Sequence, residues 1–322
     1  MGETAGAAAG HLPVMADRVL ALLAPALEPD GAILVDATLG RAGHARALLD
    51  AHPGLAIIGV DTDVTAIECS RRLLAPYAAR VTLVHAVYDE IPEIVAGQGH
   101  PRVQGILFDL GVSSPQLDDP ERGFAYSYDA PLDMRMDQTR GITAADVVNT
   151  YPAAELAGIL REYGEERFGR RIADAIAAVR ADAPITSTKR LSDIVRESIP
   201  AAARRTGGNP AKRTFQALRI AVNGELAALD RALPAALGNL AVGGRIVVLA
   251  YHSLEDRAVK RALAAQATDS TPAGLPVPLA SGQPRFRLLT RGAERPSADE
   301  LTSNPRAASA RLRAAERVRD AA

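Results

Sequence analysis

The chain contains no tryptophan, and aromatic residues make up only 4% of its 322 residues. Alanine and the aliphatic residues must therefore fill the core, for which this length, roughly two domains' worth, is ample. A single cysteine, Cys69, excludes both a disulfide framework and a cysteine-ligated zinc site, and no other metal site is expected. These shortages favour a globular protein of the reducing cytoplasm.

Long hydrophobic runs are also missing. No uninterrupted apolar stretch approaches the roughly 18 residues that cross a bilayer, so no membrane partner is expected. Residues 1–10 carry neither a basic residue nor an apolar centre, which is unlike a signal peptide. We expect them to form a disordered leader.

The net charge of −1 conceals an uneven distribution. Residues 1–120 hold 7 Lys and Arg against 15 Asp and Glu, whereas residues 161–219 hold 13 against 7 and residues 281–322 hold 9 against 5. This asymmetry suggests a cationic or neutral ligand for the first part and a polyanion for the later parts. The alternative is that each charged face is merely solvated.

Short apolar runs alternate with helical patterns in the first third of the chain. The predicted strands are 32–38, 55–61, 81–85 and 105–110, and the helices between the first three are about 44–51 and 66–75. Such alternation is typical of a parallel sheet covered on both faces. The predicted fold class is therefore α/β and Rossmann-like.

This rhythm stops after residue 110, because the next convincing strand is 245–250. The interval carries helical patterns over 143–149, 153–163, 165–181, 188–198 and 212–231. The last of them precedes the strand directly and is predicted to be its crossover helix. We therefore expect a discontinuous main domain, 11–118 and 211–322, interrupted by a helical domain at 119–210.

Acidic residues end several of the predicted strands. In parallel sheets ligands bind beyond the carboxyl ends of the strands, which here carry Asp36, Asp61 and Asp109. A dinucleotide favours G-x-G-x-x-G and a nucleoside triphosphate favours a lysine after the glycines, but residues 40–43 read only Gly-Arg-Ala-Gly. S-adenosylmethionine has a sulfonium cation and no phosphate, so an acidic pocket suits it better.

Positions along the chain suggest a role for each cofactor residue. Asp61 lies about 20 residues after the glycines, where a carboxylate can accept both ribose hydroxyls. Ala42, Gly43 and His44 would contact the methionine part, and Tyr88 would stack on adenine. Each has an ordinary structural alternative, since an acid at a strand end often caps a helix and a histidine at a helix start is often only hydrogen-bonded.

The strand ending at Asp109 leads into a turn with two serines and a proline, which suits methylation of an amino group. The lone pair of a nucleobase amine is delocalised, so an acceptor must take an N–H hydrogen bond before the lone pair can face a methyl group. Asp109, helped by the backbone carbonyls of 112–115, fits this task, and positioning supplies most of the acceleration. Ser113 and Pro115 are catalytic candidates beside it. An ordinary serine-capped loop is the alternative.

Six motifs in order resemble ribosomal RNA small subunit methyltransferase H, a bacterial family. They are Asp109–Asp118, Glu121–Tyr126, Pro131–Asp137, Tyr163–Phe168, Arg213–Arg219 and His252–Arg261. The resemblance covers about residues 11–317. It implies a class I S-adenosylmethionine-dependent fold and methyl transfer to N4 of a cytidine in 16S rRNA near the decoding centre, with the small ribosomal subunit as partner.

The resemblance also implies a set of site residues. The cofactor residues would be Ala42, Gly43, His44, Asp61, Tyr88, Asp109 and Gln116. Two positions depart from the family, which usually has glycine at Ala42 and phenylalanine at Tyr88. Asp133 is a further catalytic candidate, as a residue lining the cytidine pocket or as a second acceptor for the amine.

Contacts to RNA are expected from basic and aromatic side chains. The basic candidates are Arg167, Arg170, Arg171, Arg204, Arg205, Lys212 and Arg213, with Arg285, Arg287, Arg291 and Arg295 in the tail; Phe124, Tyr126 and Tyr128 are candidates for stacking on a base. Packing inside the helical domain is the alternative for the aromatic rings.

Two rival functions are a nicotinamide dehydrogenase and a non-catalytic RNA-binding assembly factor. The sequence leaves open the assembly state of the substrate subunit, any cation requirement and the oligomeric state, a homodimer included.

Overall fold

The computed structural model describes residues 13–204, 209–269 and 282–320, so the predicted leader at 1–10 and the candidate Arg205 lie outside the described residues. The chain forms two compact units. One consists of Met1–Gly111 and Leu229–Ala322 and is called the sheet unit below; the other, Val112–Ala228, is called the helical unit. No described helix has the length and apolarity that crossing a membrane would require.

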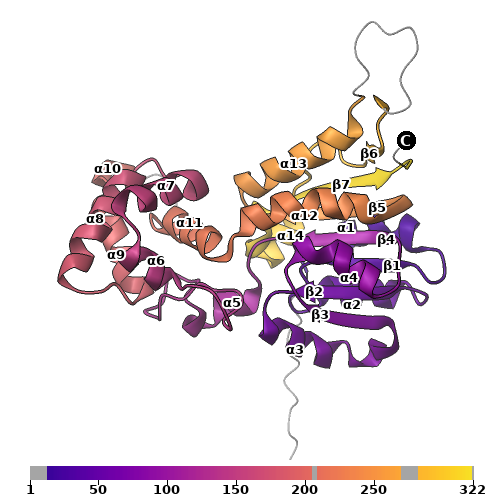
Figure 1. The fold of residues 1–322 in the computed structure, drawn as a ribbon, viewed down its shortest axis with the longest axis horizontal. Coiled ribbons are helices and arrows are strands. Elements are labelled where there is room, and N and C mark those ends of the chain that lie inside the picture. The colour runs from indigo at the N-terminus through magenta and orange to yellow at the C-terminus, as the bar shows by residue number, and fades with distance from the viewer. Residues whose placement is uncertain (1–12, 205–208, 270–281, 321–322) are drawn as a thin grey trace, which may run out of the picture. The chain divides into compact units, whose positions relative to one another are not determined.

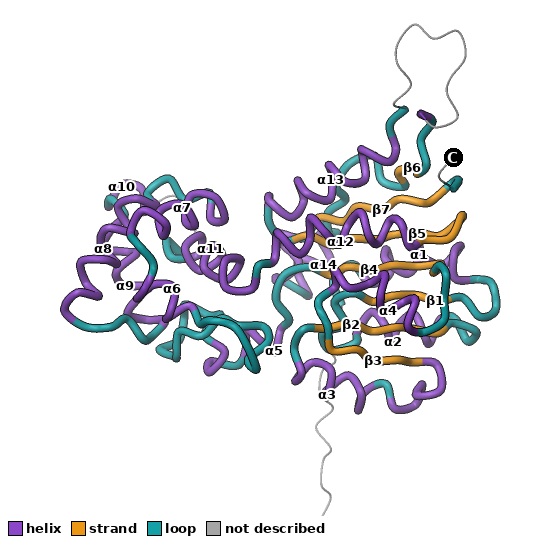
Figure 2. The backbone as a smooth tube through the Cα atoms, in the orientation of Figure 1, coloured by secondary structure: helices purple, strands orange, loops and turns teal. Residues whose placement is uncertain are grey.

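The sheet unit is built on one seven-stranded sheet with the order β3-β2-β1-β4-β5-β7-β6 (Figures 1 and 2). The strands are β1 (Ile33–Asp36), β2 (Ala56–Asp61), β3 (Val81–His85), β4 (Val103–Asp109), β5 (Leu240–Ala250), β6 (Phe286–Leu288) and β7 (Arg311–Arg317). The first five are parallel, whereas β7 runs antiparallel to both β5 and β6. The fold is the Rossmann-like α/β class that the sequence predicts.

Helices cover both faces of this sheet because successive strand residues point to opposite sides. Ile33 and Val35 join one apolar cluster and Leu34 joins the other, and all three are buried. The first cluster includes residues of α4 (Ile91–Gly97), α12 (Glu225–Asn239) and α13 (Ser253–Ala267); the second includes residues of α1 (Ala16–Leu27), α2 (Gly43–Ala51) and α3 (Val64–Leu73). A short helix, α14 (Ala298–Ser303), precedes β7.

The antiparallel edge is a correction to the wholly parallel sheet that the sequence suggests. β7 escapes a search for apolar runs because three arginines and a glutamate interrupt its apolar residues. Their charge is balanced inside the unit: Arg313 binds Asp256 of α13 at 2.7 Å, and Glu316 binds Arg245 of β5 at 2.8 Å. β7 therefore has the charge of a surface strand but pairs inside the sheet.

The helical unit contains seven helices among its described residues. They are α5 (Ser114–Asp118), α6 (Ala144–Thr150), α7 (Ala153–Gly164), α8 (Gly169–Asp182), α9 (Thr188–Ser198), α10 (Ala201–Arg204) and α11 (Lys212–Asn223). They enclose a separate apolar cluster that includes Leu160, Ile172, Leu191 and Phe215. This cluster gives the unit a core of its own.

The predicted crossover helix at 212–231 is two helices. Gly224 adopts a left-handed conformation with φ of 61° and ends α11, and α12 follows. Phe215 and Leu218 of α11 are buried in the core of the helical unit, whereas Leu229 of α12 is buried against the sheet. The helical unit therefore spans Val112–Ala228, wider at both ends than the expected 119–210.

Candidate active site

Three neighbouring strands place their acidic ends at one edge of the sheet. β1 lies between β2 and β4, and these strands end at Asp36, Asp61 and Asp109. Asp36 is 2% exposed, and its burial raises its pKa to about 7, with the neighbouring His44 opposing the rise. The strand-end carboxylates thus gather as the sequence predicts.

A tight turn joins β1 to α2. The Leu39 amide donates to the Val60 carbonyl at 2.9 Å, and the Ala42 amide donates to Leu39 at 2.7 Å, which ties the turn to β2 and folds it back on itself. Ala42 is 1% exposed and left-handed, with φ of 56°. Left-handed backbone costs a non-glycine residue about 1–2 kcal/mol. Ala42 therefore introduces local strain that a glycine, which the resemblance implies at this position, would avoid.

Asp61 accepts two backbone hydrogen bonds, one on each carboxylate oxygen. Oδ2 receives the Gly40 amide and Oδ1 receives the Asp63 amide, both at 2.8 Å. Burial raises the pKa of Asp61 to about 6, against the lowering effect of these hydrogen bonds. Each oxygen of a carboxylate has two lone pairs, so both can still accept a hydroxyl group.

His44 lies in the first turn of α2 with its side chain 5% exposed. Its Nε2 is 3.6 Å from Asp109 Oδ2, too long for a hydrogen bond, and neither ring nitrogen has a hydrogen-bond partner among the described residues. A buried polar group without a partner is uncommon in a folded protein. Beside the strand-end carboxylates, the imidazole fits a ligand-facing role better than a structural one.

Asp109 is held by two residues that the sequence does not identify. Its backbone amide donates to Thr38 Oγ1 at 2.6 Å, and its Oδ1 accepts the Tyr251 hydroxyl at 2.6 Å. Tyr251 directly follows β5, the strand next to β4. The rule that ligands bind beyond strand ends would have found Tyr251 had it been applied to the fifth strand.

Tyr88 begins a short 3₁₀ turn, Tyr88–Glu90, after β3. Its ring packs against Phe108 of β4 with a centroid distance of 5.7 Å and an interplanar angle of 76°, an edge-to-face arrangement. The side chain is half-buried. This packing fixes the ring near the strand ends, as a stacking role requires.

The remaining predicted site residues belong to the helical unit. Ser113 precedes α5, and its amide donates to the Gln116 side-chain Oε1 at 2.9 Å, so Gln116 orders the turn that contains Pro115. Gln116 is 5% exposed. Gln116 therefore caps α5 within its own unit, in addition to the cofactor-binding role that the resemblance implies.

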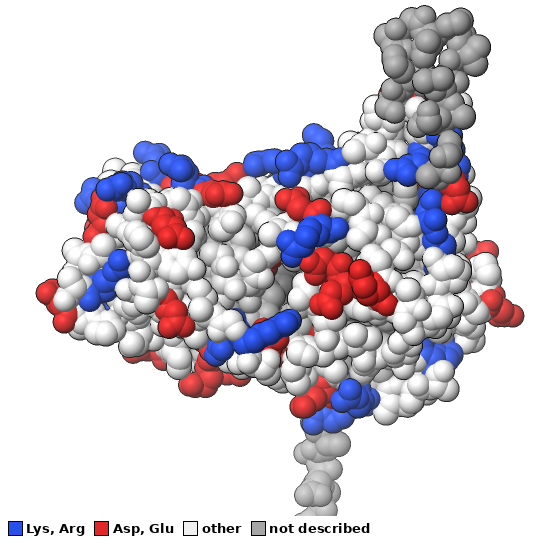
Figure 3. Space-filling model, in the orientation of Figure 1, with Lys and Arg blue, Asp and Glu red and all other residues white. Residues whose placement is uncertain are grey.

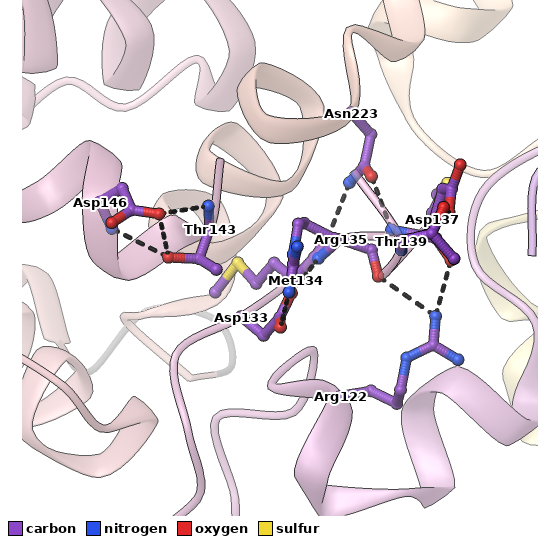
Figure 4. A network of polar contacts seen from close by, with 10 residues as sticks. Arg122, Asp133, Met134, Arg135, Asp137, Thr139, Thr143, Asp146 and Asn223 are labelled. Atoms are coloured by element: carbon purple, nitrogen blue, oxygen red, sulfur yellow. Dashed lines mark hydrogen bonds and ion pairs between the residues drawn. The ribbon is translucent and has the colours of Figure 1, made fainter. Parts of the chain in front are cut away.

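The carboxylate of Asp133 is hydrogen-bonded to the neighbouring Arg135 (Figure 4). Its two oxygens receive Nε and Nη2 of Arg135 at 2.9 and 2.8 Å. Burial raises the pKa of Asp133, but the Arg135 hydrogen bonds outweigh burial and hold it below its usual value. The same loop is fixed by Asn223, which donates to the Met134 carbonyl, and by Arg122, which donates to the Met136 carbonyl, both at 2.8 Å. Asp133 thus contributes to the shape of this loop.

A model of the MraW methylase family matches residues 8–318. The chain belongs to this family. The curated relatives include "Ribosomal RNA small subunit methyltransferase H" of Thermobifida fusca, 67% identical over 97% of this chain and 95% of that protein. The protein of the same name from Frankia alni is 64% identical over 96% of this chain and 95% of its own length. These findings confirm the predicted family and exclude the dehydrogenase alternative.

Members of the MraW family are S-adenosylmethionine-dependent methyltransferases, and the residues of this methylase fit that cofactor. Asp61 has lone pairs that can accept ribose hydroxyls, and both ring nitrogens of His44 are without a hydrogen-bond partner among the described residues. The acidic ends of β1, β2 and β4 favour a cation over a pyrophosphate.

The aromatic candidates of this methylase differ in exposure. Phe124 is 6% exposed in the core of the helical unit, and Tyr126 packs edge-to-face on Phe215 at 5.6 Å. Tyr128 is 50% exposed. For Phe124 and Tyr126 the packing alternative therefore describes the structure, and Tyr128 remains the candidate for stacking on a base.

The basic candidates also divide into paired and available side chains. Arg170 pairs with Asp174 at 3.0 Å, and Arg213 donates to the Glu165 carbonyl at 3.1 Å. Arg171 and Lys212 are exposed, and their side chains make no hydrogen bond or ion pair to the described residues. Figure 3 shows Lys and Arg side chains along the edge of the helical unit where α7 and α10 lie, with Asp and Glu between them.

Proposed function

We propose that this MraW-family enzyme methylates N4 of a specific cytidine in 16S rRNA of the small ribosomal subunit, near the decoding centre, in the cytoplasm. The observation that carries the proposal is Asp109. Its carboxylate lies at the end of β4, the strand next to β1. One of its oxygens is bound by Tyr251, and the other makes no hydrogen bond to His44. The names of the 67% and 64% identical relatives support small-subunit rRNA as the substrate.

The cofactor supplies a methyl group on a cationic sulfur. Asp109 Oδ2 would accept an N–H of the cytidine amine, which turns the nitrogen lone pair towards that methyl group. The carboxylate also lies close to the positive charge that develops on the nitrogen as the new bond forms. Methylation itself makes this nitrogen acidic, so its N–H proton then passes to Asp109 Oδ2 and the nitrogen becomes neutral. The enzyme therefore needs a well-placed acceptor more than a strong base.

The turn after Asp109 would assist this acceptor. The Ser113–Gln116 hydrogen bond orders the turn, and the backbone carbonyls of 112–115 would be further acceptors for the amine. Those of Ser113 and Pro115 already receive one amide each, from Leu117 and Asp119. We assign Ser113 and Pro115 to holding these carbonyls in place. We assign Asp133 to the shape of its own loop, because Arg135 already binds both of its oxygens.

The helical unit would bind the RNA. Its segment 161–219 has an excess of 6 positive charges, 13 Lys and Arg against 7 Asp and Glu. Arg171 and Lys212 have no acidic partner among the described residues and are exposed, so they are available to phosphates. Tyr128 offers an exposed ring to an unstacked base.

Mapping of methylated nucleosides by mass spectrometry tests the proposal. We expect 16S rRNA from a strain lacking this gene to lose one N4-methylcytidine, and the wild-type gene to restore it. A gene carrying Asp109→Asn should not restore it. Unchanged rRNA methylation in the deletion strain would refute the proposed substrate. Binding of the purified protein to the small subunit without methyl transfer would support the non-catalytic alternative instead.

A further inference from the structure

The motif His252–Arg261 has no role in the function described so far, and its first residues form a fixed turn after β5. Glu255 is 3% exposed, and its Oε2 accepts the backbone amides of Tyr251 at 2.8 Å and His252 at 3.1 Å. His252 Nδ1 in turn accepts the Glu255 amide at 3.3 Å and caps α13. A carboxylate that binds two consecutive amides allows the backbone at Tyr251 little freedom.

This turn places the Tyr251 hydroxyl on Asp109. The O–H donates to Oδ1 at 2.6 Å, across 142 residues of chain. Burial, followed by the charge of Asp109, raises the pKa of Tyr251 well above its usual value, so the hydroxyl keeps its proton and remains a donor. The side chain is partly buried and packs against the second apolar cluster of the sheet unit.

The two oxygens of Asp109 are therefore not equivalent. Oδ1 is bound by Tyr251, whereas Oδ2 points towards His44 Nε2 at 3.6 Å without a hydrogen bond. The terminal torsion of an aspartate is broad, so an unrestrained carboxylate samples many orientations. A single strong hydrogen bond to one oxygen selects among them.

We propose that Tyr251 is a positioning residue for methyl transfer, which binds Asp109 Oδ1 and so presents Oδ2 to the target amine. The inference rests on the proposed function, in which Asp109 accepts an N–H of cytidine. Tyr251 acts through Asp109 and touches neither substrate nor cofactor. Glu255 and His252 support it by fixing the turn on which it lies.

Replacement of Tyr251 by phenylalanine tests this inference with little change in packing. A hydrogen bond to a charged group is stronger than one between neutral groups, so we expect Tyr251→Phe to slow single-turnover methyl transfer at least about tenfold. The affinities for S-adenosylmethionine and rRNA should stay at wild-type values. The matched control is Tyr77→Phe, because the Tyr77 hydroxyl donates to another carboxylate of the same unit, Asp50, on the surface. The control should keep the wild-type rate.

A double-mutant cycle separates positioning from general damage. If Tyr251 acts only through Asp109, then Tyr251→Phe should cost nothing further in a protein that already carries Asp109→Ala. A wild-type rate in Tyr251→Phe, or losses that multiply in the double variant, would overturn the inference while leaving the proposed function intact. A wild-type protein that transfers no methyl group to rRNA would overturn both.

Discussion

Removal of the Asp61 carboxylate should weaken cofactor binding strongly. The side chain is fixed by the Gly40 and Asp63 amides, so its orientation is set before a ligand arrives. Two ribose hydroxyls would each make a charge-assisted hydrogen bond of about 1.5–3 kcal/mol, and loss of the pair corresponds to a factor of about a hundred or more in the dissociation constant. We expect this loss in Asp61→Ala. Asp61→Asn should also weaken binding, because its NH2 group would face one of the two backbone donors.

The same residue should give binding a pH dependence. Burial raises the pKa of Asp61 from 3.8 to about 6 in the folded protein, so folding favours its protonated form. Its contribution to stability is therefore full below pH 3.8 and is lost as the pH rises through 6. Ribose hydroxyls favour the ionised form, so cofactor affinity should fall as the pH drops below about 6, by up to about tenfold per pH unit. Asp61→Asn should lack the contribution of Asp61 to this pH dependence. Asp36, with its pKa near 7, is present in both proteins and contributes equally to both.

Isothermal titration calorimetry with S-adenosylmethionine between pH 5 and 8, a range chosen to bracket these groups, measures both effects. Thermal unfolding should accompany it, because Asp61→Ala leaves both the Gly40 and the Asp63 amides without their acceptor and Asp61→Asn leaves one of them without it. Asp17→Ala, at an exposed aspartate in the first turn of α1, is the control and should bind normally. Wild-type affinity in a folded Asp61→Ala protein would refute the ribose assignment.

Three further outcomes are expected. Asp109→Asn should fold and bind RNA normally but lose about a hundred- to a thousandfold in single-turnover rate, with a smaller loss in cofactor affinity; a rate within about threefold of wild type would contradict its role as acceptor. Charge reversal of Arg170 and Arg171 together should weaken RNA binding in filter assays and lower its salt dependence by about one unit of slope per lost phosphate contact. Arg171→Glu alone should act more strongly than Arg170→Glu, because Asp174 already pairs with Arg170, and a parallel loss of cofactor affinity would show a structural role instead. Gly123→Ala should lower the free energy of unfolding in urea by at least about 2 kcal/mol, because φ is 71° and the new Cβ would lie 2.4 Å from the Pro131 carbonyl oxygen. The control is Gly158→Ala in α7, whose new Cβ meets no atom within 4 Å and which should be tolerated.

Local patterns were sufficient for the parallel part of the sheet and for the carboxylates that end its strands. Buried parallel strands are short apolar runs, so β1 to β4 could be read directly, and the strand-end rule then pointed to Asp61 and Asp109. The strands β6 and β7 were missed. β6 has only three residues. β7 contains three arginines and a glutamate, and the charge of Arg313 is balanced by Asp256, which lies far away in the chain. The prediction of one helix over 212–231 was wrong at Gly224. The apolar periodicity continues through this residue, but its backbone is left-handed and ends α11.

By itself the sequence determined the family, the α/β class and which carboxylates end which strands, because each of these depends on neighbouring residues along the chain. Only the tertiary structure decided what those residues touch. It paired Tyr251 with Asp109, Arg135 with Asp133 and Tyr126 with Phe215, and it assigned α11 to the helical unit. The partners in the Tyr251–Asp109 and Tyr126–Phe215 pairs lie about ninety or more residues apart in the sequence. The interaction energy of each pair depends on the distance between the two side chains and on their burial. Both are set by folding and are not encoded in the local sequence.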